Sequence, residues 1–300
     1  MKNKRMMSAA IAVLMAGSLA ACGGSGASTP AASGAASTST AASAAAAGED
    51  KFASLGDFTM TVGHAQPEGN PRFVSMEQFA ADVAEATNGH VKIEVYGNGQ
   101  LGTEKEMLEQ VVAGTVQGMR GGQFDFSPRL LMFTLPFLTN TRAQVTALLQ
   151  SDLAQKVCAE AEGETGTVII NLCDAGGYRQ FSNSKHPIKT PADLKGMKIR
   201  VVGSPLFLDT FTALGANPTQ MSWADAQPAM ASGAVDGQEN PISVYQAAKL
   251  HTVAQKHITM WGYMNDPLVF VVNKDIWNSW TPADREAVRQ RSEERRVGKE

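Results

Sequence analysis

Two arginines lie in strand-like runs of the sequence, and their side chains are suited to binding an anion. Arg179 lies in GGYRQF and Arg200 in MKIRVV. Lysine is the commoner cation on the exposed face of a strand, whereas a guanidinium presents a rigid fork that pairs with a carboxylate through two hydrogen bonds. In a partly dry cleft such a pair would select an anionic ligand. The alternative is that both arginines form structural salt bridges.

The stretch AVDGQENP, residues 234–241, gathers several polar side chains between two amphipathic helical patterns. A turn needs glycine, proline, asparagine or aspartate, but it does not need all of them together. We therefore expect either an over-polar loop or a loop in which several of these side chains face a ligand.

Motifs of the common enzyme classes are missing from the sequence. GNGQLG, residues 97–102, matches a dinucleotide fingerprint between a predicted strand and a predicted helix. The preceding VKIEVY alternates charged and apolar residues, however, whereas the buried parallel strand of such a site is almost entirely apolar. We therefore interpret GNGQLG as a turn. No G-x-S-x-G, H-E-x-x-H or Walker A motif is present, and the spacing of Cys158 and Cys173 does not suggest a metal site.

The N-terminal sequence predicts an exported lipoprotein. Basic MKNKR precedes a short apolar run that ends in LAAC, which is typical of a signal peptide over residues 1–21 with Cys22 as the lipidated first residue of the mature chain. Residues 22–50 are mostly small and polar, and we expect them to form a flexible tether. The expected location is the periplasm or the cell surface, anchored through Cys22, and which membrane carries the anchor stays open.

The charge of the chain argues against nucleic acid as a partner. The formal net charge is −3, and removing the signal peptide takes away three basic residues, Lys2, Lys4 and Arg5. Cys158 and Cys173 then remain. In an oxidising compartment they either pair with each other or stay as free buried thiols.

Apolar periodicity predicts an α/β fold. Strand patterns at 57–65, 91–97, 167–176 and 266–273 alternate with helical patterns, among them 75–89 and 103–114. Polar clusters fall at the strand ends, where open α/β sheets bind their ligands.

Several motifs together resemble one family. YGNGQLG, LPFL, NSKHPIKTPADLKGMKIR, ALGANP and AVDGQENP, in this order between residues 57 and 284, are similar to those of the DctP family, the solute-binding proteins of tripartite ATP-independent periplasmic (TRAP) transporters. The resemblance implies a receptor that is not an enzyme and needs no cofactor. It hands a small organic carboxylate to a membrane permease.

The resemblance also implies site residues. Arg200 would bind the carboxylate of the substrate bidentately, Arg179 would support or share this contact, Asn240 would bind near the same anion, and Trp223 would line the pocket. By the same resemblance, Asp236, Gln238 and Glu239 would order their loop or meet the transporter.

Three more residues fall where the family varies its specificity contacts. These are His64, Arg120 and Gln123. Arg120 would suit a C4-dicarboxylate, which we favour slightly, whereas Gln123 and Trp223 would suit a sugar acid.

The implied fold has two α/β lobes that close about a hinge around a ligand in the cleft between them. Lobe I would comprise residues 51–177 plus 266–300, and lobe II residues 178–265. The charged tail at 291–300 resembles translated sequencing-adapter sequence, so we expect native C-terminal sequence to be missing.

Two other functions stay open. A periplasmic enzyme acting on acidic sugars would need paired carboxylates, for which Asp236 and Glu239 form the only tight pair near the proposed site. A ligand sensor that docks to a signalling receptor is the other alternative. The oligomeric state cannot be read from the sequence.

Overall fold

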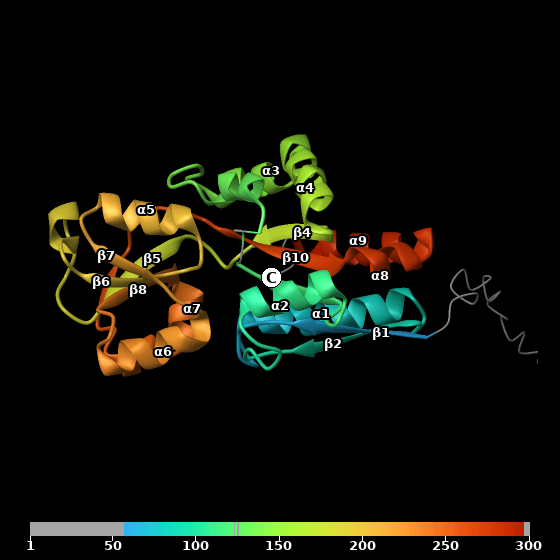
Figure 1. The fold of residues 1–300 in the computed structure, drawn as a ribbon, viewed down its shortest axis with the longest axis horizontal. Helices are drawn as coiled ribbons and strands as arrows, with labels where there is room; N and C mark the ends of the chain where they lie inside the picture. Colours follow the sequence, from blue (N-terminus) through green and yellow to red (C-terminus); the bar gives the residue numbers. More distant parts are fainter. Residues whose placement is uncertain (1–56, 123, 125, 297–300) are drawn as a thin grey trace, which may run out of the picture. The chain divides into compact units, whose positions relative to one another are not determined.

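The computed structural model describes residues 57–122, 124 and 126–296. Its strands form two separate five-stranded sheets, and this agrees with the predicted α/β class (Figure 1). We call them sheet A and sheet B.

Sheet A has the strand order β2-β1-β3-β10-β4, in which β10 runs antiparallel to both of its neighbours. Its strands are β1 (Phe58–Gly63), β2 (Val91–Tyr96), β3 (Gly118–Gly121), β4 (Thr167–Asp174) and β10 (Pro267–Asn273). Its helices are α1 (Pro71–Ala86), α2 (Glu104–Ala113), η1 (Pro128–Thr134), α3 (Arg142–Leu149), α4 (Asp152–Thr165), α8 (Lys274–Ser279) and α9 (Pro282–Arg296).

Sheet B has the order β7-β6-β8-β5-β9, with β8 in the centre. Its strands are β5 (Arg179–Asn183), β6 (Lys198–Val201), β7 (Asn217–Gln220), β8 (Gly237–Pro241) and β9 (His257–Thr259). Its helices are η2 (Pro191–Leu194), α5 (Pro205–Ala213), α6 (Trp223–Ser232), α7 (Ile242–Ala247) and η3 (Leu250–Val253).

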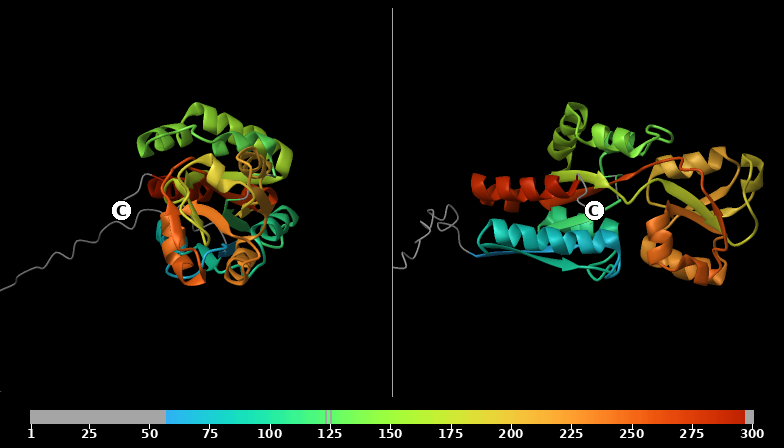
Figure 2. Two further views of the ribbon diagram at one scale, coloured as in Figure 1. Left: turned by 90° about the vertical axis from the view of Figure 1, so that its left-hand side faces the viewer. Right: turned by 180° about the vertical axis from the view of Figure 1, so that it is seen from behind.

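Sheet A buries apolar side chains on both faces, because successive residues of a strand point to opposite sides. In β10, Val269 and Val271 pack with α2, η1, α3 and α4, whereas Phe270 and Val272 pack with α1, α8 and α9. In sheet B the residues of α5 pack on one face and those of α6 and α7 on the other (Figures 1 and 2). Side chains on the two faces of sheet B therefore contact different helices. Arg179 contacts a residue of α5, and Arg200 contacts a residue of α6.

Two segments of the described chain cross between the sheets, at 175–178 and at 260–266. The first contains Gly176 and Gly177, with φ of 98° and 107°, a region that residues with a Cβ seldom adopt. A Cβ on Gly176 would lie 2.7 Å from the Oγ of Ser243. These glycines allow the chain to turn sharply as it leaves sheet A.

Local sequence explains where α2 begins and ends. Thr103 accepts a hydrogen bond from the backbone N–H of Glu106, and the Glu106 carboxylate accepts one from the N–H of Thr103. Gly114 ends the helix in the left-handed conformation. This cap fixes the position of Glu104, the first residue of the helix.

One expectation about local structure is wrong. GQENP is not a loop, because residues 237–241 form β8 and all five are buried. Cys158 and Cys173 form no disulfide. No helix in the described part of the chain is both long and apolar enough to cross a membrane.

Candidate functional site

Arg200 is buried in β6, and its guanidinium contacts a backbone carbonyl. Its Nε and Nη2 both donate to the carbonyl of Met221, at 3.0 and 2.8 Å. Among the described residues, no carboxylate lies within ion-pair distance of it. Burial lowers the pKa of Arg200 to about 10, and the nearby charge of Glu239 opposes this shift. Arg200 is therefore a desolvated cation that an anion can still pair with.

Trp223 lies beside Arg200 at the start of α6. Ser222 caps this helix by accepting the N–H of Asp225. The cap places the Trp223 ring 5.4 Å from Cζ of Arg200, within range of a cation–π interaction. The indole Nε1 is buried and has no acceptor among the described residues. The ring forms an apolar wall with one unsatisfied donor.

Arg179 is also buried, but its guanidinium is occupied. Nε and Nη2 pair with the carboxylate of Glu239, and Nη1 donates to Oδ2 of Asp266 at 2.8 Å. Burial opposes the charged form, yet Asp266 and Glu239 outweigh it and hold the pKa of Arg179 well above its ordinary value. Arg179 thus forms the structural salt bridges that were the alternative for both arginines.

The two arginines project from opposite faces of sheet B. Arg200 stacks on Trp223 of α6, whereas Cζ of Arg179 lies 5.1 Å from the ring of Phe207 in α5. Strand alternation explains the difference. Arg200 of β6 pairs with Gln238 of β8 and shares its face of the sheet. Arg179 lies on the opposite face, together with Phe181 and Glu239.

The polar side chains of β8 form hydrogen bonds with one another and with β5 inside the sheet. Gln238 donates to Ser182 at 2.8 Å, and Asn240 donates to Gln238 at 2.7 Å. Glu239, which also accepts from the hydroxyl of Tyr263 at 3.0 Å, is fully buried. Gln238 and Glu239 thus order the sheet and cannot meet a transporter. Because Glu239 is bound to Arg179, it forms no catalytic pair with Asp236.

On the side of sheet A, His64 and Arg120 lie at the C-terminal ends of neighbouring strands. The parallel register pairs Gly63 with Met119, so His64 and Arg120 follow one position further. Nδ1 of His64 accepts the N–H of Gln66 at 2.9 Å, and the neutral ring therefore carries its proton on Nε2. That nitrogen is buried without a partner in the described residues. Burial and the charges of Arg120 and Arg72 hold the pKa of His64 well below 6.5.

Arg72, which the sequence analysis missed, adjoins Arg120. Nη2 of Arg120 donates to the carbonyl of Arg72 at 2.7 Å and to Oγ of Ser75 at 2.6 Å. Nε of Arg72 donates to the carbonyl of Ala175 at 2.7 Å. Nη2 of Arg72 and Nε of Arg120 are buried without acceptors in the described part. Burial lowers the pKa of Arg72 to about 10.

Glu104 brings a carboxylate into the same region, and it too was missed. It accepts the backbone N–H of Gly122 at 3.2 Å, and burial raises the pKa of its carboxyl group. The signal was in the sequence, because Glu104 is the second residue after GNGQLG at a well-capped helix start.

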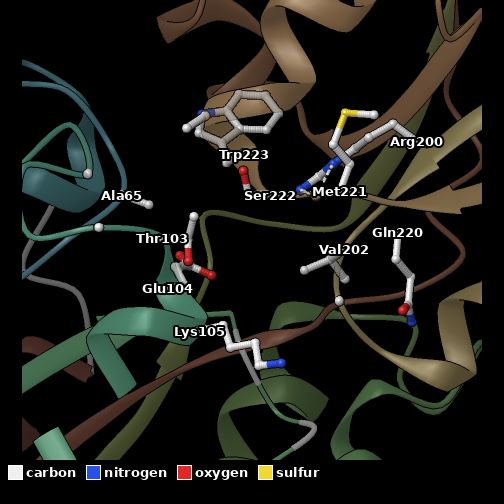
Figure 3. A pocket seen from close by; sticks show the side chains of 14 residues that line it. Ala65, Thr103, Glu104, Lys105, Arg200, Val202, Gln220, Met221, Ser222 and Trp223 are labelled. Carbon is white, nitrogen blue, oxygen red and sulfur yellow. Dashed lines mark hydrogen bonds between the residues drawn. The ribbon is translucent and has the colours of Figure 1, made fainter. Parts of the chain in front are cut away.

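A pocket of about 290 Å³ opens between these parts of the two sheets (Figure 3). Residues of the GNGQLG turn and of α2 line one side, and residues of β6 and α6 line the other. Its labelled lining residues are Ala65, Thr103, Glu104, Lys105, Arg200, Val202, Gln220, Met221, Ser222 and Trp223.

The structure thus brings two of the predicted site residues, Arg200 and Trp223, to the wall of one pocket. Arg179, Asn240, His64 and Arg120 are buried close by but do not line it. Gln123 and Cys22 lie outside the described residues. Within the described ranges, no group of three or more His, Cys, Asp or Glu side chains could hold a metal ion.

Comparisons with known proteins agree with this architecture. The sequence model of DctP, bacterial extracellular solute-binding protein family 7, matches residues 62–298. The 2,3-diketo-L-gulonate-binding periplasmic protein YiaO of Escherichia coli is 29% identical over 239 residues, which are 79% of this chain and 72% of that protein.

Two solved structures extend the likeness. A TRAP periplasmic solute-binding protein of Ralstonia eutropha H16 with bound (S)-2-acetolactate is 46% identical, with a TM-score of 0.74 over 80% of this chain and 77% of that one. One from Polaromonas sp. JS666 bound to D-erythronate is 26% identical, with a TM-score of 0.76 over 80% of each chain. The chain therefore belongs to the DctP family of bacterial extracellular solute-binding proteins, the receptors of TRAP transporters, and it is a receptor rather than an enzyme.

Proposed function

We propose that this receptor captures a small organic carboxylate in the pocket at Arg200 and delivers it to a TRAP membrane permease. The observation that carries the proposal is the Arg200 guanidinium, which is buried at the pocket wall without a carboxylate partner in the described residues. A buried cation of this kind is costly until a ligand supplies the opposite charge.

The ligands of the relatives support the same class. The Ralstonia structure holds (S)-2-acetolactate and the Polaromonas structure holds D-erythronate, and both are small oxygen-rich acids. A pocket of about 290 Å³ is at the lower end of the usual range for small-molecule sites, and this favours ligands of that size.

We assign roles to the remaining candidates on the same basis. Arg200 binds the carboxylate, and Trp223 packs against the carbon skeleton. Arg179 supports the site from the other face of the sheet, and Asn240 adds a polar contact at the buried end. His64, Arg120 and Gln123 contact the far end of the ligand.

A thermal-shift screen of the purified protein against small organic acids tests the function. A ligand at 100 times its Kd adds about 2.7 kcal/mol of stability, which raises the Tm of a domain of this size by about 5–10 °C. Glucuronate, succinate, D-erythronate and (S)-2-acetolactate cover the main classes. If no acid raises the Tm of a folded sample, the proposal fails.

The lobes and the anchor are further parts of the proposal. Lobe I comprises residues 51–177 plus 266–300 and lobe II residues 178–265, which is consistent with the strands of sheets A and B. A ligand-dependent decrease in the radius of gyration in solution scattering would support closure about this division.

Cys22 carries the lipid that ties the receptor to a membrane. Replacement Cys22→Ser should release the protein from the membrane fraction and abolish labelling by a radioactive fatty acid. Unchanged labelling of the variant would disprove the anchor.

A further inference from the structure

The charged side chains at the cleft come from both sheets. The C-terminal ends of β1, β3 and β4 and the start of β10 meet at one edge of sheet A. Asp266 just precedes β10 and pairs with Arg179 of sheet B. The charged group consists of Arg72, Arg120, Arg179, Arg200, Glu104, Glu239 and Asp266.

The described members of this group carry one positive charge in excess, since four arginines face three carboxylates. Lys105, which also lines the pocket, is exposed to solvent and is not counted with this group. Two of the three carboxylates, Glu239 and Asp266, are already bound to Arg179. His64 is neutral, because its pKa lies well below the ordinary value. A ligand with one carboxylate would make the group neutral, whereas a ligand with two would leave an excess negative charge.

The unsatisfied polar atoms indicate what the rest of the ligand offers. His64 Nε2–H, Arg72 Nη2 and Arg120 Nε are buried donors without acceptors in the described residues. Asp266 Oδ1 is a buried acceptor without a donor there. A hydroxyl group donates to Asp266 and accepts from a neighbouring N–H, and a carbonyl oxygen accepts from His64. A second carboxylate has no proton to give to Asp266.

Glu104 adds a carboxylate on the pocket wall across from Arg200 (Figure 3). Its contact with the N–H of Gly122 holds it there without neutralising it. Two carboxylates brought together in a site closed to water repel strongly, because little solvent screens them. Glu104 is thus suited to oppose a second anionic group.

We propose that the cleft selects acids with a single carboxylate and neutral hydroxyl or carbonyl oxygens at the other end, and that Glu104 is the residue that rejects a second carboxylate. The inference rests on the proposed function and names its substrate class. The proposed class differs from the C4-dicarboxylates that the sequence alone slightly favoured.

Matched ligand pairs test the class in the unaltered protein. (S)-2-Acetolactate and 2-hydroxy-2-methylpropanedioate have the same number of non-hydrogen atoms and differ by a methyl group against a carboxylate oxygen. D-Erythronate and meso-tartrate differ by a terminal CH₂OH against a carboxylate. Calorimetric titration should give a Kd for the monocarboxylate that is lower by on the order of a hundredfold in at least one pair.

The outcomes separate this inference from the proposed function. Dicarboxylates that bind as tightly as their monocarboxylate partners in both pairs would overturn the single-carboxylate class and leave the receptor function intact. If these four acids and the broader acid panel all fail to bind, the proposed function falls first and the inference falls with it.

Glu104→Gln tests the role of the residue, because it keeps the shape of the side chain and removes its charge. The ratio of the dicarboxylate Kd to the monocarboxylate Kd should fall about tenfold or more in this variant. Glu106→Gln is the matched control on the same helix, since its side chain is exposed and glutamine preserves the capping box. An unchanged ratio in a folded Glu104→Gln protein would overturn the role of Glu104. The ligand pairs in the unaltered protein test the class independently of this variant.

Discussion

Arg179 and Arg200 belong to the same sheet and are equally buried, with 3% of each side chain exposed, yet they are in opposite chemical states. Arg179 pairs with two carboxylates of the protein itself. Arg200 has a single carbonyl and an aromatic face, and among the described residues no carboxylate pairs with it. The comparison teaches that burial of an arginine does not identify a binding residue. A missing internal partner is the better indication, because a ligand can then satisfy the charge.

Removing Arg179 should lower the stability of the folded protein. Arg179→Ala leaves Glu239 and Asp266 buried and unpaired, so the free energy of unfolding should fall by about 3–5 kcal/mol. Urea denaturation followed by circular dichroism measures this loss. The pair of exposed Lys185 with partly buried Asp236 is the control. Asp236 keeps its hydrogen bond from the backbone N–H of Lys198, so Lys185→Ala should change stability by less than about 1 kcal/mol. A small loss in Arg179→Ala would mean that the pair is not structural.

Removing Arg200 should affect the ligand rather than the fold. Arg200→Ala should weaken binding by about 2–5 kcal/mol, because the carboxylate of the ligand loses its charged partner. Its unfolding free energy should change by only about 1 kcal/mol, since no internal carboxylate is left unpaired. Calorimetry measures the first and urea denaturation the second. Arg200→Lys should also weaken binding, since the fork is lost.

Arg129→Ala is the matched control for Arg200→Ala. Arg129 is an exposed arginine that pairs with Glu160 and Glu164 far from the pocket residues in sequence. Its replacement should leave the affinity unchanged. Equal affinities of the Arg200→Ala variant and the unaltered protein would remove Arg200 from the site.

Trp223 provides the aromatic face that Arg200 contacts, whereas Arg179 contacts carboxylates. Trp223→Leu keeps an apolar wall but removes the ring 5.4 Å from the guanidinium, and binding should weaken by about 0.5–2 kcal/mol. Trp223→Phe should lose less. If the leucine and phenylalanine variants bind equally well, the ring face does not contribute.

The buried His64 at the edge of sheet A predicts that the stability of the protein depends on pH. Its pKa is held well below the 6.5 expected in the unfolded chain, so the unfolded state binds more protons as the pH falls below 6.5. The contribution of His64 to stability is therefore complete above this pH and declines below it, by about 1 kcal/mol at one pH unit lower. His64→Gln should remove this part of the pH dependence. Parallel stability curves from pH 7.5 to 5.5 would show that His64 does not titrate as described.

The fold and the candidate Arg200 could be predicted from the sequence, but which arginine pairs with an acidic residue of the protein could not. The capping box of α2 depends on neighbours along the chain, which the sequence displays directly. Whether an arginine meets an acid depends instead on strand register. Glu239 reaches Arg179 because β8 pairs with β5 and places both on one face. Nothing local in GQENP distinguishes this buried strand from a polar loop.

Arg72 and Glu104 were missed for a related reason. Both lie near the start of a helix, where charged side chains are common and usually solvated. They become part of the cleft only because the edge of sheet A brings α1, α2 and the end of β3 together. Such convergence is a tertiary property. The signal that points to a candidate ligand site here is the set of buried polar atoms without partners in the described residues.

The pair between Arg179 and Asp266 has a mechanical consequence. Asp266 lies where the chain leaves the second crossing segment for sheet A, and Arg179 starts the first strand of sheet B after the other crossing segment. Arg179 also donates its backbone N–H to the carbonyl of Met264 at 2.7 Å, so the two crossings are held side by side by an ion pair and a backbone hydrogen bond. In the lobe closure proposed above, these contacts would resist sliding of one segment past the other and leave rotation as the available motion. Release of the ligand would then require only the reverse rotation, with the hydrogen bonds within each sheet kept.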